Sequence, residues 1–344
     1  MSTPLLFEEQ QDVNSVECFW ASLAFVRFGL ATIVLIGHIH DFFLVKDWTR
    51  FFSLFSPQVA VFSFLLISGY SIAHSIAMKP NGFLIRRARR IFSVYWPVLM
   101  LNFILMWTIN EKFEMPNGFN VLPPTLWEGI GHLFLLQEFF VTTISSNLPL
   151  WSLSIECWYY VVAPLLILIP FRWMIGMILV SAAAYCCRQF YIFQGPSMFG
   201  YPMFILGWGW LLGFVYYYNK EKILIKALMF TLPLFVAVPI LLRGKYPLAS
   251  INIISTVFCI SYARNFKLPL ILRQIFNYLG DISFPLYVLH WPAILFSYAI
   301  LKIQNPIFLT LFSFLLAVLL LPVAKHLSNI RICHSQNGKV GIKS

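Results

Sequence analysis

Apolar runs about as long as a lipid bilayer is thick recur along the chain, separated by short segments that contain charges, Pro or Gly. A helix needs about 20 such residues to cross the hydrocarbon core of a membrane. The runs lie at about residues 18–40, 57–78, 91–110, 150–169, 171–190, 199–218, 223–242, 248–263, 282–303 and 306–325. This pattern predicts an all-α, polytopic membrane protein with about ten transmembrane helices and no soluble domain.

The composition excludes a water-soluble fold for most of the chain. Hydrophobic residues make up 60% of the sequence and charged residues 11%, whereas soluble domains contain about 25% charged residues. The first 17 residues hold no Lys or Arg, so they lack the basic start of a cleaved signal peptide. We expect a cytoplasmic N-terminal tail at 1–17, one membrane domain at 18–327 and a cytoplasmic C-terminal tail at 328–344.

Positive charge is distributed unevenly between the two sides of the predicted bundle. If the N-terminus is cytoplasmic, the inside segments carry sixteen Lys and Arg residues and the outside segments seven, and Arg27 completes the total of 24. Cytoplasmic segments of membrane proteins are enriched in these residues. This asymmetry predicts that both termini lie in the cytoplasm, and it makes the net charge of +11 a sign of membrane topology. It predicts contact with the lipid bilayer and not with nucleic acid.

The six cysteines predict neither a metal site nor a disulfide framework. They form no CxxC pair and fall mostly within apolar runs, so we expect buried structural thiols. The longest connection, at about 111–149, combines prolines with a partly apolar stretch and is expected to be a re-entrant or interfacial segment.

Two polar residues share one face of the first apolar run. An unpaired Arg27 costs at least about 2.5 to 3.5 kcal/mol there, so it needs a partner or a wet cavity. His38 follows eleven residues later, which is about three helical turns and about 16 Å along the same face. The alternative is that Arg27 extends to the inner interface and His38 simply ends the helix on the outside.

Four arginines, at 86, 87, 89 and 90, precede the third run. Enrichment of cytoplasmic segments in positive charge accounts for at least two of them. Arg87 and Arg90, however, lie one turn apart on one helix face, and guanidinium groups bind phosphate oxygens in a bidentate manner. This spacing indicates a site for a cytoplasmic anion such as a nucleotide-bearing cofactor.

Three further polar residues lie within apolar runs. Glu156 lies about one turn into the fourth run, and we expect it near the outer boundary at the depth of His38. His290 lies in the ninth run, where packing and function are equally good explanations. Asp281, at the start of that run, is expected to cap the helix.

Five segments, in this order, resemble the acyltransferase-3 family of integral membrane acyltransferases, which includes O-acetyltransferases of bacterial surface polysaccharides. They are RFGLATIVLIGH at 27–38, FSFLLISGYSI at 62–72, RRARRIFSVYW at 86–96, WSLSIE at 151–156 and LGDISFPLYVLHWP at 279–292. The stretch between 165 and 278 is similar only as apolar helices. The chain differs from the usual pattern at Ala24, Ser93 and Cys157.

The resemblance implies transfer of an acetyl group from cytoplasmic acetyl-CoA, as co-substrate, to a sugar hydroxyl at the outer leaflet of the inner (plasma) membrane. The acceptor would be a lipid-linked or surface polysaccharide such as O-antigen, capsule or exopolysaccharide. Arg27, Arg87 and Arg90 would hold the donor. His38 would be the general base or a transiently acetylated nucleophile, and Glu156 would orient its imidazole. No metal is expected.

Other residues of the matching segments have an open role, in substrate binding or in packing: His290, Trp151 and Ser154. The rival interpretation is a secondary transporter or flippase for a glycan-related or anionic substrate, because intramembrane Arg, His and Glu also mark transport pathways. A third interpretation is a scaffold protein that catalyses no reaction.

Overall fold

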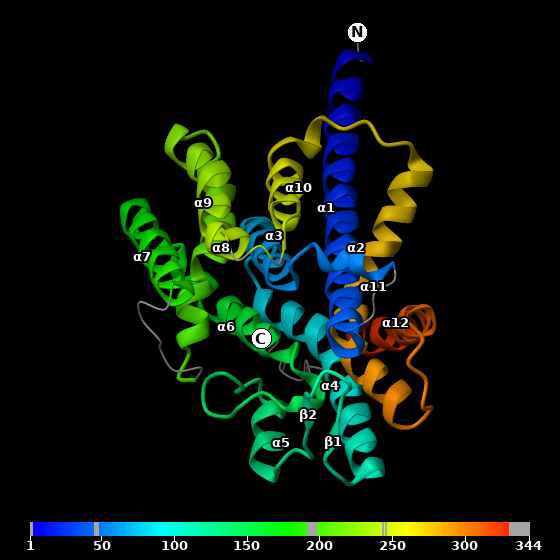
Figure 1. Cartoon of the computed structure of the whole chain (residues 1–344). Coiled ribbons are helices and arrows are strands. Elements are labelled where there is room, and N and C mark those ends of the chain that lie inside the picture. The colour runs from blue at the N-terminus through cyan, green and yellow to red at the C-terminus, as the bar shows by residue number, and fades with distance from the viewer. Residues whose placement is uncertain (1–2, 45–47, 191–197, 243, 245, 330–344) are drawn as a thin grey trace, which may run out of the picture.

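The computed structural model describes residues 3–44, 48–190, 198–242, 244 and 246–329, which form a bundle of helices (Figure 1). The long helices are α1 (Thr3–Phe43), α3 (Pro57–Met78), α4 (Phe83–Ile109), α6 (Leu150–Leu166), α7 (Phe171–Gln189), α8 (Tyr201–Asn219), α9 (Ile223–Leu242), α10 (Ala249–Tyr262), α11 (Leu270–Ala299) and α12 (Pro306–Asn329). The short elements are α2 (Thr49–Ser53), β1 (Phe113–Glu114), β2 (Asn120–Val121), α5 (Leu126–Leu133), η1 (Ser145–Asn147) and η2 (Ala263–Asn265).

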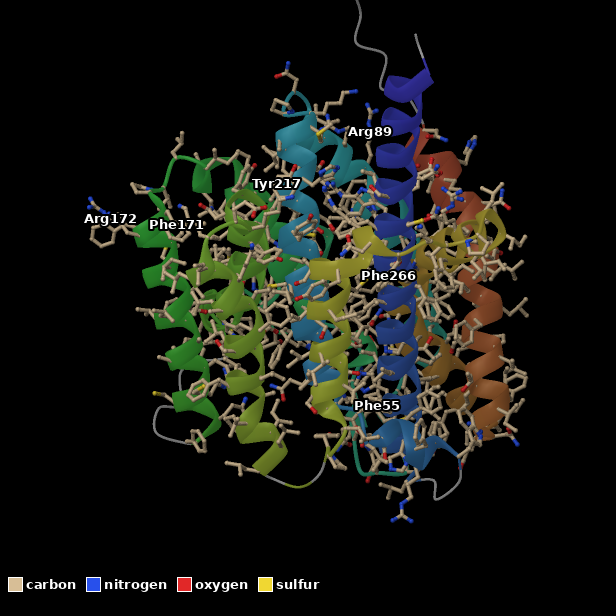
Figure 2. The ribbon with its side chains drawn as sticks, turned by 90° about the horizontal axis from the view of Figure 1, so that it is seen from above. Phe55, Arg89, Phe171, Arg172, Tyr217 and Phe266 are labelled. Atoms are coloured by element: carbon tan, nitrogen blue, oxygen red, sulfur yellow. The ribbon has the colours of Figure 1, made fainter. Side chains whose placement is uncertain are left out.

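The predicted all-α membrane fold is confirmed. Among the described residues, seven helices are long and apolar enough to cross a membrane, namely α1 from Asn14 onward, α3, α4, α7, α9, α11 and α12. The other three predicted runs are also helical, as α6, α8 and α10, although α6 and α10 have only 17 and 14 residues. Side chains fill the interior, and Arg89 lies toward the end of the molecule where α1 begins while Phe55 lies toward the opposite end (Figure 2).

Several helices begin earlier than the apolar pattern predicts. α1 begins at Thr3, within the predicted tail, and α4 begins at Phe83, so the arginine cluster is helical. α11 begins at Leu270, so the prediction that Asp281 caps this helix is wrong. Instead its carboxylate accepts a hydrogen bond from Lys325 Nζ at 2.7 Å. An apolar run marks only the part of a helix that lies in lipid. The helix itself can extend further into water, because its backbone hydrogen bonds are formed within the helix.

The cysteines partly follow the prediction. The five described cysteines are free thiols. Cys18 and Cys259 are buried, whereas Cys157, Cys186 and Cys187 are half-buried. Cys333 lies outside the described residues, as does the predicted C-terminal tail beyond residue 329.

The helices that carry the polar residues pack closely because small residues lie at their crossings. A Cβ atom on Gly280 of α11 would lie 2.4 Å from the Cβ of Ala24 of α1. The two backbones therefore approach at this level, and the more C-terminal residues of both helices lie side by side. This packing places Arg27 near Ser283, and His38 near His290.

The FSFLLISGYSI segment serves a second crossing, between α3 and α8. A Cβ atom on Gly69 would lie 1.9 Å from the carbonyl oxygen of Trp210, and one on Gly213 would lie 2.1 Å from that of Leu66. Such contacts are possible only for glycine, which lets two helix backbones touch. Gly69 in this segment is therefore a packing residue.

The connection at 110–149 is packed onto the bundle by hydrogen bonds to three helices. Asn147 Nδ2 donates to the carbonyl oxygen of Val288 on α11 at 3.1 Å, and Trp291 Nε1 donates to that of Ser145 at 3.1 Å. On α4, the Asn102 side chain bonds Ser146, and on α6 the Ser154 hydroxyl bonds the carbonyl oxygen of Leu135. We call residues 110–149 the 110–149 segment.

Candidate active site

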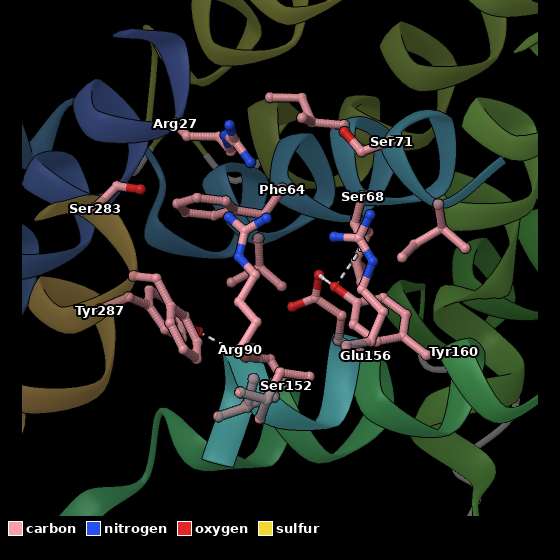
Figure 3. A pocket seen from close by; sticks show the side chains of 18 residues that line it. Arg27, Phe64, Ser68, Ser71, Arg90, Ser152, Glu156, Tyr160, Ser283 and Tyr287 are labelled. Atoms are coloured by element: carbon pink, nitrogen blue, oxygen red, sulfur yellow. Dashed lines mark hydrogen bonds between the residues drawn. The ribbon is translucent and has the colours of Figure 1, made fainter. Parts of the chain in front are cut away.

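A cavity of about 110 Å³ lies between α1, α3, α4, α6 and α11 (Figure 3). We call it the arginine cavity, because Arg27 of α1 and Arg87 and Arg90 of α4 line it. Arg87 and Arg90 are one turn apart and share a face of α4, as their spacing predicts. The structure therefore brings together the three arginines that the sequence marks as donor-binding.

The arginine cavity has more positive than negative charge. Its one carboxylate, Glu156, accepts a hydrogen bond from Tyr160 Oη at 2.5 Å. Within the described part of the chain, no carboxylate forms an ion pair with any of the three arginines, and the buried Nε of Arg27 has no hydrogen-bond partner. Guanidinium groups left without partners in a cavity fit a polyvalent anion, whose oxygens would satisfy them.

Glu156 does not lie where the sequence places it. The carboxylate lines the arginine cavity, and His38 lines a different one. Tyr160, one turn further along α6, holds Glu156 and approaches Ser68 of α3 at 3.3 Å (Figure 3). On α6, which begins at Leu150, the residue that lines the cavity of His38 is Trp151.

A second cavity of about 510 Å³, which we call the basic cleft, adjoins the arginine cavity. Arg27 and Arg90 line both cavities. The basic cleft adds three more cationic residues, Arg86, Arg89 and Lys325. The guanidinium of Arg86 donates hydrogen bonds to the carbonyl oxygens of Asn81 and Lys79, in the turn that precedes α4. The four clustered arginines therefore differ in their surroundings, although the sequence presents them as equivalent.

A third cavity, of about 410 Å³, lies at the other end of the arginine cavity, and we call it the histidine cavity. Val61 and Tyr287 line both. The polar and aromatic residues of the histidine cavity are His38, Asp41, Gln58, Glu138, Thr143, Trp151, Tyr246, Tyr287 and Trp291. Neighbouring cavities share lining residues from the basic cleft to His38, so the three follow one another along α1.

The immediate neighbours of His38 come from α11. The rings of His38 and His290 are parallel to within 5°, with centroids 5.5 Å apart, and the ring of Trp291 meets His38 edge-on at 4.9 Å. His290 Nδ1 lies 2.8 Å from the carbonyl oxygen of Tyr287, so this nitrogen carries the proton. The buried Nε2 of His290 then offers a lone pair, which has no partner among the described residues.

The two remaining predicted site residues behave differently. Trp151 lines the histidine cavity. Ser154 is fully buried, and its hydroxyl lies 2.7 Å from the carbonyl oxygen of Leu135 and 2.9 Å from that of Gln137. Ser154 therefore anchors the 110–149 segment to α6 instead of facing a cavity.

Three residues that line the cavities were missed by the sequence analysis. Tyr160 lies four residues after Glu156, a spacing that joins side chains on a helix and could have identified it. Tyr287 separates two cavities, and its hydroxyl lies 2.6 Å from that of Ser152 on α6. Glu138 comes from the 110–149 segment. No periodic pattern marks either of these two, because their partners are distant in sequence.

A helical bundle that encloses an arginine-lined cavity beside a histidine-lined one is the architecture of a membrane protein with a polar site inside the bilayer. The acyltransferase-3 family model, described as an acyltransferase domain, matches residues 20–325. The chain belongs to this family and is a membrane acyltransferase. Searches of curated proteins and of solved structures gave no match.

Proposed function

We propose that this protein transfers an acetyl group from acetyl-CoA to a hydroxyl group on a sugar of a surface polysaccharide. The observation that carries the proposal is the succession of the basic cleft, the arginine cavity and the histidine cavity along α1, each of which shares lining residues with the next. A donor with an anionic end and a reactive end about 16 Å away would lie with its charges at Arg27 and its thioester near His38.

The donor side consists of the arginines. The CoA moiety carries phosphate groups, and Arg27, Arg87 and Arg90 offer forked N–H donors to such oxygens. Glu156 belongs to this side and not to the imidazole. Glu156 and Tyr160 line the same cavity as the arginines, where a single negative charge offsets part of the repulsion between the guanidinium groups and still leaves a net positive charge for the donor.

The transfer itself takes place at His38. A neutral imidazole nitrogen accepts the proton of the sugar hydroxyl while the hydroxyl oxygen forms a bond to the acetyl carbonyl carbon. The carbon–sulfur bond breaks, and the proton passes to the sulfur to give CoA thiol. In the two-step version an imidazole nitrogen first bonds the acetyl carbon, the carbon–sulfur bond breaks, and the sulfur leaves as CoA thiol with the proton of the other ring nitrogen. The sugar hydroxyl oxygen then bonds the acetyl carbon, the bond to the imidazole breaks, and the hydroxyl proton returns to the ring.

His290 is the residue that positions His38 in this scheme. Its Nδ1–H is committed to the carbonyl oxygen of Tyr287, so its Nε2 can only accept. The ring of His290 lies parallel to that of His38 and sets the plane of the His38 imidazole, and the Nε2 lone pair of His290 is left to accept a hydrogen bond at the site. His290 thereby takes the orienting role that the sequence suggested for Glu156.

The orientation in the membrane follows from the charge distribution. The arginine-rich end of the molecule, which includes the start of α1, faces the cytoplasm, where acetyl-CoA is made. The histidine cavity and the 110–149 segment then face outward in an inner (plasma) membrane.

Labelled acetyl-CoA and purified full-length protein test the proposal, with the alkali-deacetylated surface polysaccharide of the host as acceptor. We expect wild-type protein to move label to the polysaccharide and His38→Ala to reduce transfer by about a hundredfold or more. His40→Ala is the matched control, because His40 bonds Thr49 at 3.2 Å and does not line the histidine cavity.

Full transfer by His38→Ala would refute the role of His38. Saturable uptake of a glycan into proteoliposomes without acetyl-CoA would instead support a transporter. Label retained on the protein in the absence of acceptor, and lost in His38→Ala, would select the two-step version.

A further inference from the structure

Glu138 lies in the histidine cavity and has no part in the reaction described above. It comes from the 110–149 segment, outside the membrane-spanning helices. Its backbone has φ of 69°, in the left-handed region that residues other than Gly rarely adopt. Its carboxylate is half-buried and lines the same cavity as His38.

The surroundings hold the backbone of Glu138 in place. Its N–H donates to the carbonyl oxygen of Val141 at 3.0 Å, and its own carbonyl oxygen accepts from the N–H of Gly200 at 2.9 Å. The preceding carbonyl, of Gln137, lies 2.9 Å from the buried Ser154 hydroxyl. Bonds from α6 and from the residues before α8 therefore fix the point from which the side chain extends.

Among the residues that the structure describes, Thr143 donates a hydrogen bond to the Glu138 carboxylate, and Arg188 lies close enough for its charge to act on it. Thr143 Oγ1 donates to Glu138 Oε1 at 2.8 Å. Burial raises the pKa of Glu138, and the Thr143 hydrogen bond and the charge of Arg188 oppose that rise only in part. A carboxylate offers about four acceptor positions, so lone pairs remain for a ligand in the cavity.

The other walls of the histidine cavity suit a carbohydrate. Trp151, Tyr246 and Trp291 provide aromatic surface, while Glu138 and Gln58 provide hydrogen-bonding groups. A sugar presents hydroxyl groups at its edge and C–H groups on its faces, and pockets of this mixed kind orient a ligand with a few polar groups among aromatic ones.

We propose that Glu138, oriented by Thr143, recognises the acceptor: its carboxylate accepts a hydrogen bond from a second hydroxyl group of the sugar while the hydroxyl to be acylated lies at His38. This inference rests on the proposed function, since it assumes a sugar acceptor. It assigns to Glu138 a specificity-determining role. The pair of contacts, at His38 and at Glu138, would select which hydroxyl is acylated.

Steady-state kinetics on the full-length protein test this assignment. The probes are acetyl-CoA, the alkali-deacetylated host polysaccharide and a panel of methyl glycosides of glucose, galactose, mannose and rhamnose. We expect Glu138→Ala to raise the KM for the acceptor by roughly ten- to hundredfold, the loss typical of a hydrogen bond to a charged group. The KM for acetyl-CoA should stay within about twofold. Glu138→Gln and Thr143→Val should act in the same direction but less strongly.

Glu111→Gln is the matched control, because Glu111 is exposed at the start of the same segment and lies outside the histidine cavity. Glu138→Gln conserves side-chain volume and decides the matter if Glu138→Ala fails to fold. An unchanged acceptor KM in the folded variant, or an equal rise in both KM values, would overturn the role of Glu138 alone. Absence of transfer by the wild-type protein to every acceptor would refute the proposed function, and this inference with it.

Discussion

At the scale of single residues, Arg27 is a charged side chain that is costly to place inside the bundle. It lies within α1, and its buried Nε has no partner among the described residues. A charge that the protein does not neutralise must be balanced by a ligand or by water. Arg27 is therefore the residue whose contribution should depend most directly on the donor.

Replacement of Arg27 by Gln should raise the KM for acetyl-CoA by roughly ten- to hundredfold and leave the KM for the acceptor unchanged, because a charged hydrogen bond to phosphate is lost. Arg27→Lys should lie between wild type and Gln, since Lys keeps the charge but not the fork. The measurement is donor titration at saturating acceptor. Arg172→Gln is the control, because Arg172 contacts Trp173 on α7 and lines none of the three cavities. Equal effects of both substitutions would contradict a specific donor contact.

His290 offers a test of positioning through two amide substitutions. In His290→Gln the amide oxygen can reach the place of Nε2, whereas in His290→Asn the shorter amide replaces only the Nδ1 side. If the Nε2 lone pair of His290 takes part in the reaction at His38, kcat should fall by about tenfold or more in His290→Asn and less in His290→Gln, with both KM values unchanged. The readout is kcat across a range of pH. Identical losses in the two variants would show that His290 serves packing only.

At the scale of elements, the 110–149 segment contains a buried histidine that should make it sensitive to acid. His132 is fully buried, its Nδ1 lies 2.8 Å from the carbonyl oxygen of Glu128, and its Nε2 accepts from the N–H of Ile144 at 3.3 Å. The ring must therefore be neutral. Burial lowers the pKa of His132 below its ordinary value, and the carbonyl and carboxylate of Glu128 oppose this shift only in part.

The sign of the pH dependence follows from this lowered pKa. Below about pH 6.5 the unfolded segment binds a proton that the folded segment does not, so the segment should lose stability as the pH falls from about 6.5 toward its lower folded pKa. We expect faster proteolysis within residues 110–149 at pH 5 than at pH 7.5. His132→Gln, which keeps an acceptor near the Ile144 N–H, should weaken the pH dependence. A cleavage rate that is independent of pH in the wild-type protein would contradict the prediction.

The crossing of α3 and α8 should tolerate no side chain at its glycines. A Cβ atom on Gly69 would overlap the backbone of Trp210, which cannot rotate away. Gly69→Val should therefore lower stability by about 1 to 3 kcal/mol or more, as overpacking does. The thermal unfolding midpoint in detergent measures it. Gly176→Val on α7 is the control, since a Cβ atom there meets nothing within 4 Å. Equal midpoints for the two variants would show that the helices can separate without cost.

At the scale of the whole molecule, the proposed orientation can be tested by labelling single cysteines in a variant that lacks the six native ones. The two labelling variants are Asn117→Cys, in the 110–149 segment, and Glu221→Cys, between α8 and α9. Both native residues are exposed. The excess of positive charge on one side predicts that a membrane-impermeant thiol reagent added to whole cells reacts at position 117 and not at 221. Reaction at 221 alone would reverse the orientation, and with it the side on which acetyl-CoA binds.

Much of the fold and part of the site follow from local rules. The ten apolar runs correspond to helices because a chain in hydrocarbon must satisfy its backbone within each segment. The common face of Arg27 and His38 follows from the geometry of a single helix. Arg87 and Arg90 meet in one cavity for the same reason. These relations lie within one element and need no knowledge of its neighbours.

Relations between elements depended on tertiary packing. The sequence alone determined that Glu156 lies in a helix, but only the packing of α6 against α3 and α4 decided that it faces arginines and not His38. Likewise, only the close approach of α1 and α11 at Ala24 and Gly280 decided that His290 lies beside His38. The periodicity of a sequence indicates which face of a helix is polar. The depth of the helix in the membrane, its rotation about its axis and the helix that it contacts are set by the fit of side chains between helices. Glu138 is the clearest case, because an irregular segment has no period and its position comes entirely from its hydrogen bonds to the bundle.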